Sequence, residues 1–318
     1  NRQTVALHLD NVVLDIGQFE TAADPELYRG DFLEGFFLRD APEFEQWQLS
    51  QRARLRDLAL RRFAGRLQAA LDGRQHDLAT ALARKLLAIE PWHEAAHRAL
   101  MLTLARMGQR GAALAQFARC QQLLDEELAA PVTAATEALY NRIQALTGPR
   151  DNLPADSSRF VGRAAELEQI EARLTTATTR LLTLAGPGGS GKTRLALAAA
   201  RARFDSYLEG VWFIDLVEQT AQDSLARLIA ATLGLALEPN RPVQEQLLTW
   251  LADKELLLLL DNFETMSGQA ALVGQIVQAA PAVAIIATSR VRLNLSSEQL
   301  MQVDGLSLTA GDELESDA

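Results

Sequence analysis

The octapeptide GPGGSGKT, residues 186–193, has the residue types and spacing that can hold a phosphate group. Glycines allow the backbone to wrap an anion at close range, with dihedral angles that side chains forbid. An apolar run precedes the loop and RLALAAARA follows it, which predicts a strand, the loop and then a helix N-terminus, where the dipole favours anions. Lys192 would contact the β- and γ-phosphates of a nucleotide, and the Thr193 hydroxyl would bind Mg²⁺. The candidate nucleotide-binding residues of this segment are Gly186, Pro187, Gly188, Gly189, Ser190, Gly191, Lys192, Thr193 and Arg194.

The segment KELLLLLDNFE, residues 254–264, runs five leucines into an aspartate. This run predicts a buried strand that ends at Asp261, and ligands of α/β sheets bind at that end of the strands. Asp261 could hold Mg²⁺ there, directly or through water. Asn262 cannot take a proton from water, whereas Glu264 could if the turn brings it round; a surface loop position is the alternative for Glu264. Arg290 follows another apolar run and could meet a γ-phosphate.

Residues 180–303 alternate short β-type runs with helical ones. Strands are predicted at 180–186, 210–216, 256–261, 283–289 and 299–303, and helices at 191–203, 223–233, 242–252 and 268–279. Strands that alternate with helices of this length indicate a mostly parallel α/β sheet with helices on both faces. We therefore predict an α/β fold for the second half of the chain.

Residues 42–145 are rich in Ala, Leu and Arg and have helical periodicity. An apolar stripe recurs every four positions along one long helix, at Leu55, Ala59, Phe63 and Leu67. Glycine and proline punctuate the pattern at 71–75, 89–92, 106–111 and 129–132. Small residues such as Ala79 and Ala113 recur 34 positions apart, the period of tetratricopeptide repeats, which are stacked helix pairs. An all-α, tetratricopeptide-like domain is predicted.

Composition and charge narrow the class of protein. The chain has 318 residues, 48% of them apolar, which suits two soluble globular domains. With a net charge of −10, neither half of the chain has the excess of basic residues that marks a nucleic-acid-binding surface. The arginines between 52 and 66 are expected on a solvated helix face. No apolar run could span a membrane, and one cysteine, Cys120, suits a reducing cytoplasm. His93 and His97 form an i, i+4 pair, expected on a helix surface rather than in a metal site.

Five segments of the second half resemble the NB-ARC-type STAND ATPases in order and spacing: RFVGRAAELEQI (159–170), the phosphate loop, GVWFIDL, LLLLLDNFE and IIATSR. The resemblance covers about 157–308. It implies a sheet with the phosphate-loop strand at its centre, Phe160 and Val161 near the adenine, and Arg290 as the sensor that distinguishes ATP from ADP. Many relatives carry a second acidic residue where Asn262 stands here, so a slow, switch-like nucleotide cycle is expected.

The first half is similar to the bacterial transcriptional activator domain of SARP-type regulators. The resemblance runs from about Val13 to Leu146, on LYRGDFLEGF (27–36), WQLSQRARLRDLALRRFAGRL, ALYNRI (138–143) and the segment 89–128. Those regulators place a winged helix-turn-helix before this domain, and some place a STAND ATPase after it. Residues 4–20 resemble only the junction after the winged helix, so the DNA-reading helix is expected outside this chain.

The predicted order is a residual junction (1–20), the activator domain (21–146), a linker (147–158), the nucleotide-binding domain (159–308) and a tail (309–318). The leading hypothesis is an ATP/ADP-binding regulatory switch of a bacterial transcriptional regulator, at most a slow ATPase. Its expected partners are promoter DNA through the winged helix, RNA polymerase and an ATP-dependent homo-oligomer, in the bacterial cytoplasm and without a membrane. Two alternatives stay open. One is a P-loop NTPase or kinase whose helical half recruits substrate; the other is a tetratricopeptide-like scaffold with a degenerate nucleotide site.

Overall fold

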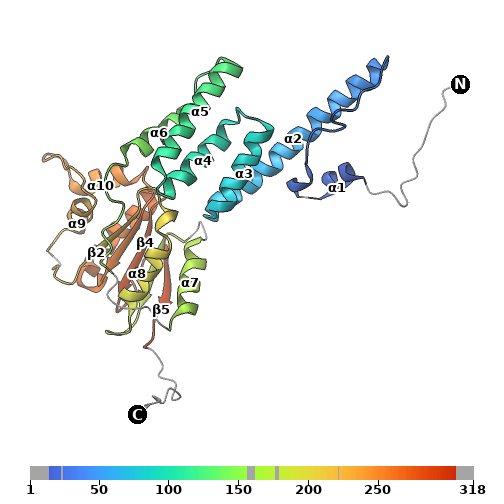
Figure 1. Cartoon of the computed structure of the whole chain (residues 1–318). Coiled ribbons are helices and arrows are strands. Elements are labelled where there is room, and N and C mark those ends of the chain that lie inside the picture. Colours follow the sequence, from blue (N-terminus) through green and yellow to red (C-terminus); the bar gives the residue numbers. More distant parts are fainter. Residues whose placement is uncertain (1–13, 23, 156–161, 176–178, 221, 306–318) are drawn as a thin grey trace, which may run out of the picture. The chain divides into compact units, whose positions relative to one another are not determined.

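The computed structural model describes residues 14–22, 24–155, 162–175, 179–220 and 222–305. The chain divides into two compact units, one made of residues 1–104 and 111–143 and the other of residues 105–110 and 144–318 (Figure 1). The first unit is helical and the second is a parallel α/β sheet with helices. The predicted fold class, an all-α domain followed by an α/β domain, is therefore confirmed.

From α2 onwards, successive helices of the first unit are joined by short connections. In chain order they are α1 (Asp15–Thr21), the 3₁₀ turn η1 (Pro25–Leu27), α2 (Pro42–Asp72), α3 (His76–Ile89), α4 (Glu94–Arg106), α5 (Arg110–Leu128) and α6 (Ala134–Ala145). Each of the four predicted breaks falls between two of these helices, because glycine and proline end helical hydrogen bonding there. The pattern of helix pairs thus follows the punctuation of the sequence.

The core of the helical unit lies along the apolar stripe of α2. Its four predicted members are buried, and they pack with small residues of α3 such as Ala79 and Ala83. Alanine at these positions lets the two helix backbones approach closely, which is the role that small residues have in stacked helix pairs. Phe19 of α1 joins the same core.

The arginines of α2 bind the chain that precedes this helix instead of only facing water. Arg52 donates to the carbonyls of Phe32 and Leu33 at 2.7 and 2.6 Å, and Arg62 donates to the carbonyl of Phe19. Carbonyls in irregular segments and in the last turn of a helix lack a regular backbone partner and need such donors when water cannot reach them freely. The prediction of a merely solvated arginine face is wrong for these two side chains, which fasten Phe19, Phe32 and Leu33 onto α2.

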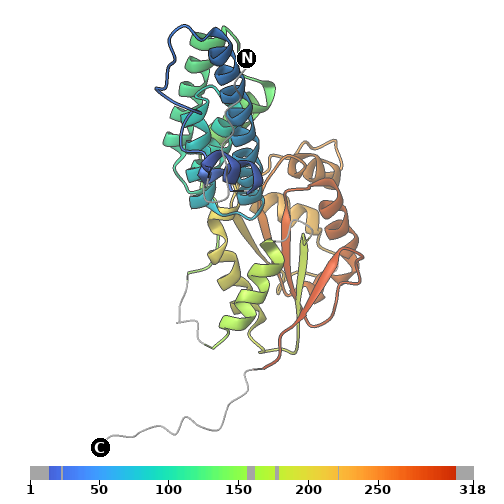
Figure 2. The same cartoon turned by 90° about the vertical axis from the view of Figure 1, so that its right-hand side faces the viewer.

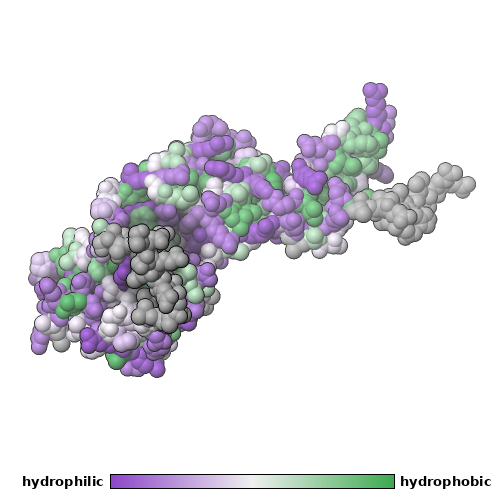
Figure 3. Space-filling model, turned by 60° about the horizontal axis from the view of Figure 1, so that its bottom comes forward, coloured by the Kyte–Doolittle hydropathy of each residue, from purple (hydrophilic) through white to green (hydrophobic). Residues whose placement is uncertain are grey.

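Aromatic side chains gather where α2 begins. The rings of Phe32, Phe36, Phe44 and Trp47 form a chain of contacts with centroids 5.5–5.8 Å apart. Phe36 and Trp47 are nevertheless 48% and 47% exposed, and the adjacent Phe37 is 67% exposed. Apolar surface therefore reaches the outside of this unit among polar neighbours (Figure 3).

The second unit is built on a five-stranded sheet in the order β2-β3-β4-β1-β5, and every pairing is parallel. The strands are β1 (Leu181–Ala185), β2 (Val211–Asp215), β3 (Leu257–Asp261), β4 (Ala284–Ser289) and β5 (Glu298–Gln302). All five predicted strands are present, with ends shifted by no more than two residues. Since parallel strands end at a common edge, the loop after β1 and the residues after β3 and β4 come together.

Helices cover both faces of this sheet, as Figure 2 shows. They are α7 (Ala164–Thr175), α8 (Lys192–Ala202), α9 (Leu225–Thr232), α10 (Val243–Leu251) and α11 (Ala270–Ala279). Helices α7 and α8 share one apolar core with alternate residues of the strands, and α9, α10 and α11 share the other. Because both faces are buried, strands β1, β3 and β4 are apolar or neutral almost throughout, as the leucine run predicted.

The outer edge of β2 is occupied by the segment before α7. The side chain of Asn152 accepts from the Phe213 backbone N–H at 2.6 Å and donates to the Phe213 carbonyl at 2.8 Å. Asp151 forms a parallel bridge with Val211 beside it. A side-chain amide thus satisfies the backbone groups that an edge strand leaves open.

No helix within the described ranges is long and apolar enough to cross a membrane.

His97 lies inside the helical unit, although the sequence placed it on a helix surface. The side chain is 1% exposed. Its Nε2 donates to the Pro91 carbonyl at 2.8 Å, and its Nδ1 accepts from the amide of Gln116. Burial lowers the pKa of His97, and the positive charges of Arg119 and His93 lower this pKa further, while the Pro91 carbonyl and Glu94 oppose them. The fold therefore holds a neutral imidazole.

We expect the stability of α4 to fall as the pH drops below about 6.5, the ordinary value for histidine. Below this pH, His97 binds a proton in the unfolded chain but stays neutral in the folded one. The free energy of unfolding that is present above this pH is therefore lost as the pH falls towards the lowered pKa of the folded state. Amide exchange of α4, corrected for the intrinsic pH dependence of exchange, measures the effect between pH 7.5 and 5.5.

Two variants complete this test. His97→Gln should cost about 1 kcal/mol at pH 7.5, for one buried hydrogen bond, and should flatten the acid dependence. His93→Gln, at the residue before α4, removes only one of the smaller influences on the pKa of His97 and should keep most of the acid dependence. An acid dependence that is unchanged in His97→Gln would show that another group is responsible.

Candidate nucleotide site

The phosphate loop connects β1 to α8 at the carboxyl edge of the sheet. Gly189 and Gly191 have φ values of 77° and 84°, in the left-handed region that favours glycine. Gly186 is constrained by space, because a Cβ there would lie 2.2 Å from the carbonyl oxygen of Val303. The loop therefore needs its glycines both for backbone conformation and for the close approach of a neighbouring segment.

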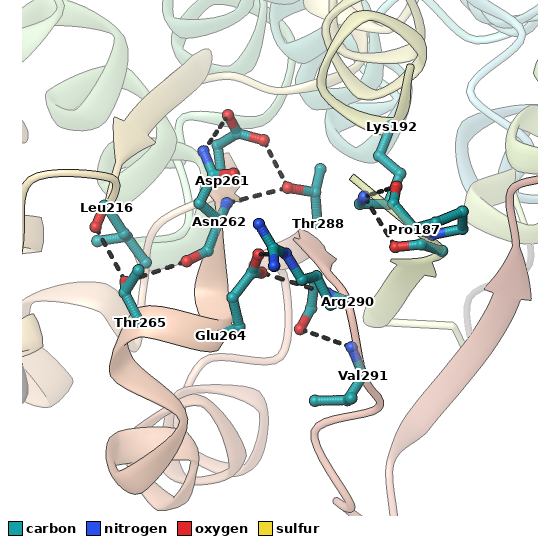
Figure 4. Close-up of polar contacts among 12 residues, drawn as sticks. Pro187, Lys192, Leu216, Asp261, Asn262, Glu264, Thr265, Thr288, Arg290 and Val291 are labelled. Carbon is teal, nitrogen blue, oxygen red and sulfur yellow. Dashed lines mark hydrogen bonds and ion pairs between the residues drawn. The ribbon is translucent and has the colours of Figure 1, made fainter. Parts of the chain in front are cut away.

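Lys192, the first residue of α8, turns its side chain back over this loop. Its Nζ donates to the carbonyls of Gly186 and Pro187 at 3.0 and 2.9 Å (Figure 4). A third hydrogen on the ammonium group remains available to another acceptor. The Lys192 ammonium group is thus bound to the carbonyls of the loop itself, and it could exchange these contacts for contacts with a phosphate.

Asp261, the last residue of β3, lies at the centre of a hydrogen-bond network. Its Oδ1 accepts from the Thr193 hydroxyl at 2.7 Å and also from the Thr288 hydroxyl. Its Oδ2 accepts from the side-chain amide of Asn262 at 2.8 Å (Figure 4). The strand, the first turn of α8 and the end of β4 thus converge on one carboxylate that is 4% exposed.

The pKa of Asp261 is raised above its ordinary value, chiefly because burial disfavours the charged form. Hydrogen bonds from Thr288 and Thr193 act in the opposite direction, and the nearby carboxylates Asp215 and Glu264 raise the pKa further. Asp215 is the direct neighbour of Asp261 in the sheet, at the end of β2. A cation at this position would relieve both the burial cost and the repulsion between carboxylates.

Asn262 takes the left-handed conformation, with φ 59° and ψ 44°. Asparagine and aspartate tolerate this region better than other residues with side chains. Its backbone N–H donates to the Thr288 hydroxyl at 3.0 Å, and the loop is fixed further by Thr265, whose hydroxyl donates to the Leu216 carbonyl at 2.9 Å. The turn after β3 is therefore fixed on both sides, and it directs the Asn262 amide at Asp261.

Glu264 and Arg290 form a pair at the mouth of the site. The Arg290 Nε lies 3.2 Å from Glu264 Oε1, and the Arg290 backbone N–H donates to Oε2 at 3.3 Å. A Cβ on Gly188 would lie 3.8 Å from Arg290 Nη2, so the guanidinium is beside the phosphate loop. The Arg290 side chain is 69% exposed and so has room to move.

Two further residues of the site went unnoticed in the sequence. Thr288 belongs to the segment IIATSR and Arg163 to the segment 159–170, where neither is marked out by its position. Arg163 is 5% exposed, and its Nη2 donates to the Ser190 carbonyl at 2.7 Å. Ser190 Oγ is buried without a hydrogen-bond partner among the described residues. The only signal in the sequence that could have identified Thr288 and Arg163 as site residues is that each is a polar residue within a segment that resembles the nucleotide-binding family.

The structure brings together most, though not all, of the sequence-predicted site residues. Thr193 and Asp261 are in direct contact, and Glu264 and Arg290 are paired nearby. Arg194 lies exposed in the first turn of α8. Phe160 and Val161, expected near an adenine, fall outside the described residues, so their positions remain predictions.

Comparison with known families gives a match in each half of the chain. Residues 13–144 match the bacterial transcriptional activator domain, and residues 152–291 match the family described as novel STAND NTPase 1. The second match falls within the STAND class that the motifs indicated.

Several relatives are named as regulators of transcription or as regulatory proteins. The chain is 36% identical over 134 residues to a protein of Mycobacterium tuberculosis (strain H37Rv) named as an HTH-type transcriptional regulator, a match that covers 42% of this chain and 15% of that protein. It is 29% identical over 286 residues to the regulatory protein AfsR of Streptomyces griseus, a match that covers 81% of this chain and 29% of AfsR. The AfsR of Streptomyces coelicolor is 28% identical over 290 residues, with 80% and 29% covered.

This chain thus spans less than a third of the length of these relatives. Within that span, it consists of a bacterial transcriptional activator domain fused to a STAND NTPase domain, and it is similar to AfsR across both.

Proposed function

We propose that this chain is an ATP/ADP-binding regulatory switch of a bacterial transcriptional regulator. The observation that carries the proposal is the 2.7 Å contact between the Thr193 hydroxyl and the Asp261 carboxylate beneath a glycine loop that opens a helix. A loop of this kind binds phosphate through its backbone amides, and an adjacent hydroxyl and carboxylate bind its magnesium ion.

The residues present fit a magnesium ion. Hydroxyl and carboxylate oxygens are the ligands that Mg²⁺ prefers, and it usually takes only one or two from the protein, with phosphate oxygens and waters as the rest. Thr193 and Asp261 would hold the ion, and the ion would neutralise charge on the β- and γ-phosphates.

Arg290 is the residue proposed to distinguish ATP from ADP. It is paired with Glu264 and lies beside Gly188, so a γ-phosphate at the loop would compete with Glu264 for the guanidinium. When a γ-phosphate is present, Arg290 would leave Glu264 and pair with that phosphate, and the loop after β4 would change conformation. ADP, which lacks this phosphate, would leave the Arg290–Glu264 pair intact. Shifting a two-state population from 1:99 to 99:1 takes about 5.5 kcal/mol, and the γ-phosphate contacts would supply a large part of it.

The activator domain gives this switch its output. Relatives named as HTH-type regulators support a role in transcription, with promoter DNA read by a winged-helix domain outside this chain. Nucleotide state would control how that domain is presented to the promoter and to RNA polymerase, in the bacterial cytoplasm, with an ATP-dependent homo-oligomer as one form of the active state. The proposal for the complete regulator rests on these similarities.

Hydrolysis is proposed to be slow. Asn262 stands next to the magnesium carboxylate and donates to it, so it offers no base for a water molecule. Glu264, the other nearby candidate, is held by Arg290. A P-loop enzyme that turns over quickly, the alternative function, needs one of these positions to accept a proton.

Replacement of Lys192 by alanine should weaken binding of MgADP and of a non-hydrolysable MgATP analogue by about 100-fold or more. Charge-assisted hydrogen bonds to phosphate contribute about 1.5–3 kcal/mol each, and Lys192 would make more than one. Isothermal titration calorimetry measures the change. Lys254→Ala, a lysine-to-alanine change elsewhere in the same unit, should bind like the unmodified chain; equal affinities for Lys192→Ala and Lys254→Ala would place the nucleotide elsewhere.

The exchange Asn262→Asp should raise ATP turnover by about tenfold or more from a starting rate below about 1 s⁻¹, because a positioned base contributes about 10²–10⁴-fold. Aspartate is compatible with the left-handed backbone at this position. Steady-state phosphate release provides the measurement. Asn294 is also left-handed, with φ 61°, so Asn294→Asp controls for the substitution itself. Unchanged turnover in Asn262→Asp at full nucleotide occupancy would mean that Asn262 does not limit hydrolysis.

A further inference from the structure

Arg163 precedes α7 and joins two backbone segments that are far apart in the sequence. Its Nη2 donates to the carbonyl of Ser190 in the phosphate loop and to the carbonyl of Asp304 just after β5, at 2.7 Å in each case. The residue is 5% exposed, and its Nη1 has no hydrogen-bond partner among the described residues, with Glu166 3.7 Å away. Burying a guanidinium costs desolvation free energy, whereas an apolar side chain could fill the same space without that cost, so the two hydrogen bonds indicate a role beyond packing.

The Ser190 carbonyl is a sensitive point of the loop. In a trans peptide the carbonyl and the following N–H point in opposite directions. With the carbonyl of Ser190 turned towards Arg163, the N–H of Gly191 must point the other way. Gly191 is the N-cap of α8, where free amides gather to bind an anion. Arg163 therefore sets the direction of one phosphate-binding amide without touching the phosphate.

The same two segments touch at a second point, at the start of the loop. The Val303 N–H donates to the Ala185 carbonyl at 2.7 Å, and the Val303 carbonyl oxygen occupies the space that a Cβ of Gly186 would need. The chain leaving β5 thus contacts the start of the phosphate loop directly and is joined to Ser190, near the end of the loop, through Arg163. A change in loop conformation must be accommodated by residues 303–304, and the reverse also holds.

We propose that Arg163 is a positioning residue that couples the phosphate loop to the segment leaving β5, so that nucleotide occupancy is transmitted to residues 303–305. This inference rests on the proposed nucleotide site. It adds the route by which that site communicates with the part of the protein that follows β5. Arg163 acts through the Ser190 peptide and takes no part in the reaction.

The bridge is tested first without nucleotide, by amide exchange in the complete chain. Arg163→Ala should speed exchange of the Ser190 and Val303 amides by about tenfold each, because both segments lose a charge-assisted hydrogen bond to the same nitrogen. Arg163→Met, which keeps an apolar stem in place of the guanidinium, should have the same effect. Faster exchange in Arg163→Ala but not in Arg163→Met would assign the effect to packing, and faster exchange in only one segment would remove the coupling; either result overturns the proposal.

Arg173→Ala is the matched control. Arg173 belongs to α7, and its Nη1 donates to the Leu300 carbonyl of β5 at 3.2 Å. Its loss should leave the exchange of the Ser190 amide unchanged. An equal rise at Ser190 in Arg173→Ala would show that any loosening of α7 from β5 disturbs the loop, against a specific role for Arg163.

The second arm measures transmission of nucleotide binding. A cysteine introduced at Gly305, in a Cys120→Ala background, carries an environment-sensitive fluorophore, and MgADP is the ligand. The label should respond to MgADP when Arg163 is present. In Arg163→Met the response should be lost even at MgADP concentrations that calorimetry shows to be saturating. An undiminished response in saturated Arg163→Met overturns the coupling.

Failure of the two proposals can be told apart. Absence of MgADP binding to the unmodified chain would defeat the proposed function, whereas the exchange measurements would still decide whether Arg163 joins the two segments.

Discussion

The contact between Thr193 and Asp261 is the interaction on which the rest of the site depends. It joins the first turn of a helix to the end of a strand 68 residues later in the chain. Parallel strands make this possible, because all of them end at one edge and each delivers its following residues there. The sheet order places β3 and β1 on either side of β4, whose Thr288 completes the network around the carboxylate.

The free-energy cost of burying the Asp261 carboxylate explains which residues surround it. A carboxylate that is 4% exposed needs donors, and two hydroxyls and an amide supply them. These donors are neutral, so the charge of Asp261 remains uncompensated among its direct partners. Such a site favours a bound cation, and the nearby Asp215 strengthens that preference. The amide of Asn262 contributes to holding the carboxylate, which is a different task from activating water.

Much of the fold could be read from the sequence because its signals are local. Four-residue apolar spacing marked the buried face of α2, and the leucine run marked β3, since a strand covered on both faces must be apolar throughout. The glycine loop and Asp261 were recognisable because their chemistry requires particular residue types. The pairing of Glu264 with Arg290 was not predicted, although both had been selected as candidates.

The features that escaped prediction depend on contacts between distant segments. His97 and Gln116 are 19 positions apart, and Arg163 bonds to a carbonyl 141 positions away. Neither the burial of His97 nor the direction of Arg163 has a local periodic signature. The arginines of α2 likewise resemble a solvated surface in the sequence, because the carbonyls that they bind lie at the end of the short helix α1 and in an irregular segment, and neither has a pattern that points to α2.

The two outer strands of the sheet are each met by a side chain from outside the sheet. Asn152 presents to β2 the same donor and acceptor that another strand would offer, and Arg173 occupies the Leu300 carbonyl on β5. A foreign strand would have to displace them before it could add to either border. Occupied backbone groups on both border strands disfavour the addition of strands from other copies of the protein, which is the first step towards fibres.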